Sequence, residues 1–161
     1  VGKTFGMEVI AWSQNLTRER ADEIGATLVT KDQLLARSDY VTIHLVLSDR
    51  TRGLLGTSEL SSMKSTAYLI NTSRGPIVDE DALVDAIQSG AIAGAGLDVF
   101  DQEPLAANHP LRNLDNTVIT PHMGYVTVET YKIFYGHALE NVQAFLDGAP
   151  IRTINEPRNA R

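Results

Sequence analysis

The 161-residue sequence contains no cysteine. This absence excludes disulfides, thiolate metal sites and thiol nucleophiles, and it agrees with a reducing cytoplasm, where we expect the protein to be located. No apolar run approaches the roughly 20 residues that a membrane-spanning helix needs, so we expect no membrane partner. Positive charge is also scarce, because 14 Lys and Arg accompany 20 Asp and Glu, for a formal net charge of −6. Such a charge argues against nucleic acid as a partner.

Apolar residues are present in sufficient number for a core. They make up 43% of the sequence, and a chain of this length is the size of one ordinary domain. Residues 1–6 have the pattern of the end of a helix that began earlier. We therefore expect the chain to be a fragment of a longer protein.

Short apolar runs alternate with amphipathic stretches. The apolar runs predict strands at residues 7–12, 27–29, 40–45, 67–71, 95–100 and 116–120. The amphipathic stretches predict helices at residues 17–24, 31–36, 57–63, 79–89 and 126–147. This alternation indicates an α/β fold with a doubly wound parallel sheet. We assign residues 1–148, with the long helix, to one domain and 149–161 to an extended tail.

Polar residues follow the predicted strands, at the edge where open α/β sheets bind ligands. They are Ser13, the segment 44–48, the segment 72–75, Asp98 and His122. Each has an ordinary structural explanation by itself. Their placement after successive strands nevertheless predicts a single site.

Three residues at or near these strand ends are candidates for the chemistry of the site. Arg74 offers a planar cation for a carboxylate or a carbonyl oxygen, although a surface salt bridge is the alternative. Glu103 precedes Pro104, which favours a defined backbone, with a solvated side chain as the alternative. His122 is either a structural histidine or a proton donor. A carboxylate beside an imidazole stabilises the protonated ring, so a pair of Glu103 and His122 would donate a proton near neutral pH.

The chain resembles the NAD(P)-dependent D-isomer-specific 2-hydroxyacid dehydrogenases over essentially its whole length. The matching strings are Asn71-Thr72-Ser73-Arg74-Gly75, Gly96-Leu97-Asp98-Val99-Phe100 with Glu103-Pro104, and Thr120-Pro121-His122. The resemblance implies a Rossmann-type domain that binds NAD or NADP. It also implies hydride transfer between NAD(P)H and a small 2-oxo acid or D-2-hydroxy acid, with no metal required.

The resemblance further implies roles for individual residues. Arg74 would bind the substrate carboxylate and carbonyl oxygen, His122 would be the acid and base, and Glu103 would keep His122 protonated. Asp98 would contact the nicotinamide end of the cofactor. The residues implied to bind the dinucleotide are Ser13, His44, Leu45, Val46, Thr51, Thr72, Ser73, Arg74, Asp98, His122 and Gly124. The full-length protein is expected to be a homodimer.

The sequence departs from the family pattern in two respects that matter for function. It contains no glycine-rich GxGxxG turn. We expect that turn, the first strand and a substrate domain to lie outside this chain. Residues 12–15 also lack the carboxylate that would repel a 2′-phosphate, and Arg18 or Arg20 would attract one. The sequence therefore leaves both NAD and NADP open.

Two other functions remain as alternatives. One is a binding module of the same fold that senses dinucleotide. The other is a fragment that is inactive in isolation. The identity of the 2-oxo acid stays open among glyoxylate, hydroxypyruvate, phosphoglycerate and longer acids.

Overall fold

The computed structural model describes residues 1–154, and these form two compact units. The first unit is Val1–His122, and the second begins at Met123. Among the described residues, no helix is long and apolar enough to cross a membrane.

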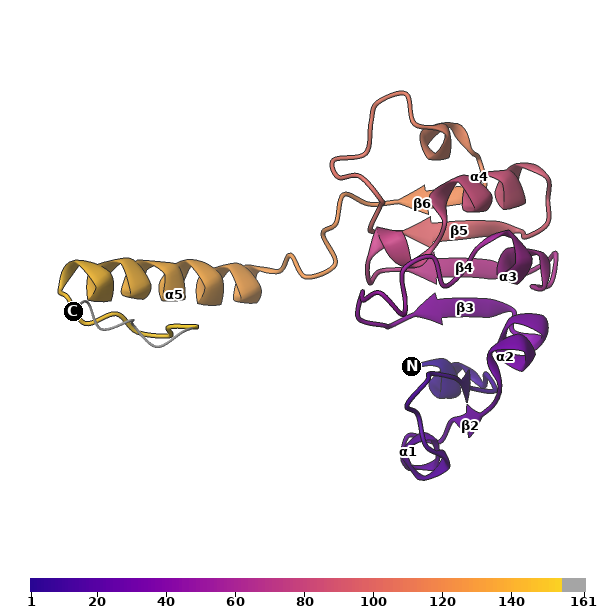
Figure 1. Ribbon diagram of the computed structural model, residues 1–161, viewed down its shortest axis with the longest axis horizontal. Helices are drawn as coiled ribbons and strands as arrows, with labels where there is room; N and C mark the ends of the chain where they lie inside the picture. The colour runs from indigo at the N-terminus through magenta and orange to yellow at the C-terminus, as the bar shows by residue number, and fades with distance from the viewer. Residues whose placement is uncertain (155–161) are drawn as a thin grey trace. The chain divides into compact units, whose positions relative to one another are not determined.

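The first unit is a parallel α/β structure, as the sequence predicted. Its strands form a two-stranded sheet of order β1-β2 and a four-stranded sheet of order β3-β4-β5-β6, and every pairing is parallel. Figure 1 shows the four strands of the larger sheet side by side. The strands are β1 (Ile10–Ala11), β2 (Thr27–Leu28), β3 (Tyr40–Ile43), β4 (Tyr68–Asn71), β5 (Gly94–Leu97) and β6 (Thr117–Ile119).

Helices connect the strands and cover the sheets. They are α1 (Arg18–Glu23), α2 (Lys31–Arg37), α3 (Thr57–Ser61) and α4 (Glu80–Gln88), with 3-10 helices η1 (Gly2–Phe5), η2 (Gly75–Ile77) and η3 (Pro110–Asn113). The predicted cap of α1 is confirmed, because the Thr17 hydroxyl accepts the N–H of Arg20. Asp79 caps α4 in the same manner, by accepting the N–H of Ala82. Side-chain caps thus fix where α1 and α4 begin.

The core lies between the larger sheet and helices α2, α3 and α4. Leu69 of β4 and Leu60 of α3 are almost wholly buried, and α4 buries Leu83 and Ile87 on one face. Burial of each such side chain contributes about 1.5–3 kcal/mol to the free energy of folding. This core fixes the carboxyl ends of β3 to β6 relative to one another.

All six described strands are shorter than the sequence predicted. The difference that matters for the site is at β5, which ends at Leu97 rather than at residue 100. The N–H groups of Phe100 and Asp101 donate to the side chains of Glu103 and Glu80 instead of to a neighbouring strand. The chain therefore leaves the sheet just before the segment that contains Glu103.

The second unit contains the long helix α5 (Val128–Leu146), which begins two residues later than predicted because Thr127 is its cap. Tyr131 stacks on Tyr135 with ring centroids 5.4 Å apart. None of the residues of α5 is buried. The assignment of α5 to the nucleotide-binding domain stays a prediction. Residues 155–161 of the predicted tail lie outside the described part of the chain.

Candidate active site

The turn after β4 is organised by Asn71, which is 1% exposed. Its side-chain amide donates to the carbonyl of Arg74 at 3.0 Å, and its carbonyl oxygen accepts the N–H of Ser73 at 3.0 Å. The Ser73 hydroxyl donates to the carbonyl of Ile43 at 2.7 Å, which ties the turn to the end of β3. Asn71 was not among the predicted site residues. A polar residue at the last position of a buried strand was the signal that could have identified it.

Gly75 allows this turn to approach the segment after β5. A Cβ atom at Gly75 would lie 2.0 Å from the carbonyl carbon of Phe100 and 2.5 Å from the nitrogen of Asp101. No side chain fits there, so the residue must be glycine. The close approach places Arg74 near enough to Glu103 for its positive charge to lower the pKa of that carboxyl group.

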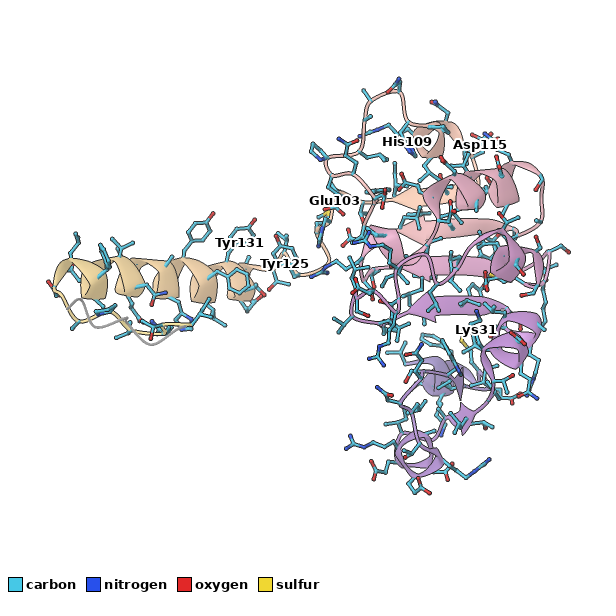
Figure 2. The ribbon with its side chains drawn as sticks, viewed as in Figure 1. Lys31, Glu103, His109, Asp115, Tyr125 and Tyr131 are labelled. Atoms are coloured by element: carbon cyan, nitrogen blue, oxygen red, sulfur yellow. The ribbon has the colours of Figure 1, made fainter. Side chains whose placement is uncertain are left out.

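Glu103 lies in the loop at the carboxyl end of β5 (Figure 2). One carboxylate oxygen accepts the N–H of Phe100 at 3.0 Å, and the other lies 2.6 Å from Nδ1 of His122. Burial raises the pKa of Glu103. The hydrogen bonds from His122 and Phe100 and the charges of His122 and Arg74 outweigh this effect, so the pKa is lowered from the ordinary 4.5. Glu103 is therefore ionised at neutral pH.

His122 follows β6 with a left-handed backbone, at a φ of 53°. Its N–H donates to the carbonyl of Thr120 at 3.0 Å, which closes a tight turn through Pro121. An ionised carboxylate only accepts hydrogen bonds, so Nδ1 must donate its proton to Glu103. Nε2 is then the ring atom that can hold or release a proton toward a substrate. The sequence prediction that Glu103 and His122 form a pair is borne out in this geometry.

Asp98 directly follows β5 and is 6% exposed. The Thr120 hydroxyl donates to its carboxylate at 2.5 Å, and its own N–H donates to the carbonyl of Asn71 at 3.0 Å. These bonds join the ends of β4, β5 and β6. Its contact with a nicotinamide stays a prediction.

A cavity of about 530 Å³ opens beside the Glu103–His122 pair. Its walls are mainly apolar, with Arg112 as the cation. The lining residues are Phe100, Glu103, Pro104, Leu105, Arg112, Ile119, Thr120, Pro121 and His122. The site thus combines the Glu103–His122 pair with space for a small molecule.

A second cavity, of about 270 Å³, lies at the carboxyl ends of β1 and β3. Thr51 forms part of one wall and holds the neighbouring turn. Its hydroxyl donates to the carbonyl of Val46 at 2.7 Å and accepts the N–H of Ser48 at 2.8 Å. The cavity brings together four predicted cofactor residues and adds Arg50. Its lining residues are Trp12, Ser13, Gln14, Asn15, Leu45, Val46, Ser48, Arg50, Thr51 and Leu54.

Residues 1–124 match the family model of the D-isomer specific 2-hydroxyacid dehydrogenase, NAD binding domain. The chain belongs to this family. It is 49% identical to a glyoxylate reductase of Aeropyrum pernix over 96% of this chain and 47% of that protein. A structure of a putative D-3-phosphoglycerate dehydrogenase oxidoreductase from Ralstonia solanacearum has a TM-score of 0.88 at 37% identity, covering 96% of this chain and 45% of that one. The chain spans about half the length of these relatives.

Solved 2-hydroxyacid dehydrogenase structures contain either cofactor. A D-lactate dehydrogenase from Aquifex aeolicus is complexed with NAD and lactic acid, with a TM-score of 0.78, 34% identity and coverage of 92% of this chain and 49% of that one. A D-isomer specific 2-hydroxyacid dehydrogenase from Xanthobacter autotrophicus Py2 is in complex with NADPH and MES, with a TM-score of 0.71, 34% identity and coverage of 91% and 60%. Both dinucleotides therefore occur among the solved structures that are similar to this chain.

The remaining predicted cofactor residues of this family lie elsewhere. His44 is exposed, and its ring is 3.0 Å from the Thr42 hydroxyl. Thr72 is exposed in the turn after β4. Gly124 belongs to the second unit. Neither Arg18 nor Arg20 lines the second cavity, where the cation is Arg50. The cofactor roles of these residues stay predictions.

Proposed function

We propose that the protein containing this chain is an oxidoreductase that interconverts a small 2-oxo acid and a D-2-hydroxy acid with a nicotinamide cofactor. The observation that supports this most is the 2.6 Å pairing of Glu103 with His122, next to Arg74, at the carboxyl ends of the strands. The membership of the chain in the NAD binding domain family supports hydride transfer as the reaction in which this pair takes part.

The three side chains have separate parts in the proposed reaction. Arg74 binds the substrate carboxylate through its planar guanidinium. His122 presents a proton on Nε2 to the carbonyl oxygen, which becomes negative during reduction. Glu103 holds Nδ1 of that ring and stabilises its protonated form. The cofactor, when bound, supplies or accepts the hydride.

The second cavity fits the adenosine end of a dinucleotide. It offers the hydroxyls of Ser13 and Thr51 and an apolar wall that includes Leu54. The lining contains no carboxylate and contains Arg50, so we propose that the protein uses NADP, with NAD as the weaker cofactor. A 2′-phosphate needs a cation and is repelled by a carboxylate.

Arg50→Gln tests this preference. The substitution should raise the Michaelis constant for NADPH and leave that for NADH unchanged. Arg37→Gln, at an exposed arginine paired with Glu8, is the matched control. A wild-type protein with a strong preference for NADH would contradict the proposal.

A dinucleotide sensor of the same fold is the competing function. The arrangement of Arg74, Glu103 and His122 favours the enzyme, because a sensor does not need a proton donor. The homodimer and the cytoplasmic location stay predictions.

The deciding assay supplies the full-length protein with glyoxylate, hydroxypyruvate, pyruvate and phosphohydroxypyruvate, and either NADPH or NADH. Oxidation of cofactor with at least one acid, and a D product where the product is chiral, is expected, and no turnover with any of them would refute the proposal.

A further inference from the structure

A second pair of glutamate and histidine, separate from the pair of Glu103 and His122, lies in the first unit. Oε1 of Glu80 is 3.1 Å from Nε2 of His109, and the two side chains are 20% and 21% exposed. Nδ1 of His109 accepts the N–H of Leu111 at 3.3 Å. The proton of a neutral His109 ring must therefore be on Nε2, which donates to Glu80.

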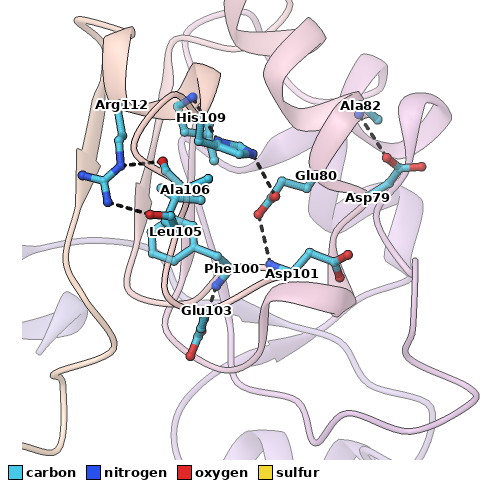
Figure 3. A network of polar contacts seen from close by, with 11 residues as sticks. Asp79, Glu80, Ala82, Phe100, Asp101, Glu103, Leu105, Ala106, His109 and Arg112 are labelled. Carbon is cyan, nitrogen blue, oxygen red and sulfur yellow. Dashed lines mark hydrogen bonds and ion pairs between the residues drawn. The ribbon is translucent and has the colours of Figure 1, made fainter.

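The other carboxylate oxygen of Glu80 is also engaged. Oε2 accepts the N–H of Asp101 at 3.1 Å. Glu80 is the first residue of α4, a helix that packs against the core and is capped by Asp79. The carboxylate thus connects a rigid element to the loop after β5, as Figure 3 shows.

Glu103 lies within this loop, between two anchored segments. On one side, Glu80 holds Asp101, whose neighbour Phe100 donates its N–H to Glu103. On the other side, the Arg112 guanidinium donates to the carbonyls of Leu105 at 2.8 Å and Ala106 at 2.9 Å. The backbone around Glu103 is therefore fixed from α4 and from η3 (Figure 3).

We propose that Glu80, oriented by His109, is a positioning residue for Glu103 and through it for His122. This inference rests on the proposed function of that pair. Acid–base catalysis depends on heavy atoms held within hydrogen-bond reach, so looseness of the loop would lengthen the contact of Glu103 with His122. Glu80 has no direct part in the reaction.

A double-mutant cycle tests the proposal in the full-length protein. Glu80→Ala should lower kcat by roughly ten-fold, a part of the 10²–10⁴-fold that a positioned acid–base group supplies, and should leave cofactor affinity unchanged. In a Glu103→Gln background the same substitution should have little further effect on kcat, because the group through which it acts is already lost. Glu80→Gln keeps one acceptor oxygen and should give an intermediate kcat.

Asp81→Ala is the matched control. Asp81 is an exposed carboxylate in the same turn of α4, so its loss changes the charge at the helix start equally. The control should leave kcat unchanged. Equal losses of kcat from Glu80→Ala in both backgrounds, or no loss in the wild-type background, would overturn the proposal.

Amide hydrogen exchange provides a readout that does not need activity. Glu80→Ala, or His109→Ala if the first variant does not fold, should speed exchange in a peptide spanning residues 98–109 and leave residues 68–71 protected. Unchanged exchange at 98–109 would contradict the claim that Glu80 holds this loop in place. Absence of turnover in the wild-type protein would instead refute the proposed function, and the exchange result would still decide whether Glu80 holds the loop.

Discussion

At the scale of single residues, the pairing of Glu103 with His122 gives the site its acid–base character. The contact is direct, at 2.6 Å, and the carboxylate also accepts the N–H of Phe100. Both side chains are about one-third exposed, so solvent screens their attraction and the pair adds little to the stability of the fold. Its importance lies in holding a proton at a defined ring atom.

The lowered pKa of Glu103 sets a pH dependence. Since the pKa in the folded protein lies below 4.5, the paired form persists above pH 4.5 and is lost only as pH falls through the lower folded value. We expect the acid limb of the kcat/KM profile to begin below pH 4.5. Glu103→Gln should remove this limb and lower kcat by roughly 10²-fold.

Glu59→Gln is the control for this measurement. Glu59 also has a lowered pKa, because it accepts hydrogen bonds from Lys31 and from the N–H of Gly56. It lies on α3, outside both cavities. A pH profile of Glu103→Gln that matches the profile of Glu59→Gln would contradict the role of the Glu103–His122 pair.

At the scale of elements, the close approach of two turns brings Arg74 to the loop after β5. Gly75→Ala forces a Cβ into the backbone of Phe100, at 2.0 Å. We expect it to lower the free energy of unfolding by about 1–3 kcal/mol and to reduce kcat, because the turns must separate. Denaturant unfolding of the variant measures the first effect.

Gly136→Ala serves as the reference substitution. Nothing lies within 4 Å of a Cβ at Gly136, which is inside α5. Alanine there should stabilise the helix by roughly 0.5–1 kcal/mol. Equal stability of Gly75→Ala and the wild-type protein would show that the turns do not meet as described.

Sequence patterns were sufficient to predict the parallel α/β fold, the order of its elements and the pairing of Glu103 with His122. These features follow from local periodicity and from the rule that strand ends share one edge. The patterns did not identify Asn71, whose side chain bonds locally to Ser73 and Arg74 but is buried only in the assembled sheet. They also did not identify Arg50, which only the folded chain brings into one cavity wall with Ser13. They also made β5 too long, because the bond from the N–H of Asp101 to Glu80 depends on tertiary structure.

At the scale of the whole molecule, α5 has an unusual number of exposed apolar side chains. They include Tyr131, Ile133, Phe134, Tyr135, Leu139, Val142, Phe145 and Leu146. Exposed apolar surface of this extent favours association. We expect the 161-residue chain to self-associate at high concentration, which light scattering would detect.

Replacing Leu139 and Phe145 by glutamate should reduce this association. The control replaces two exposed polar residues of the same helix, Lys132 and Gln143, by glutamate. A clean monomer of the unmodified chain at high concentration would contradict the expectation.

In the proposed reaction, His122 holds the proton that a 2-oxo acid receives. Steady-state reduction of a 2-oxo acid by full-length wild-type protein and by His122→Asn tests it most directly, with cofactor affinity measured in parallel by fluorescence titration. We expect kcat to fall by about 10²–10⁴-fold while cofactor affinity is unchanged. A His122→Asn variant that retains the wild-type kcat would contradict it.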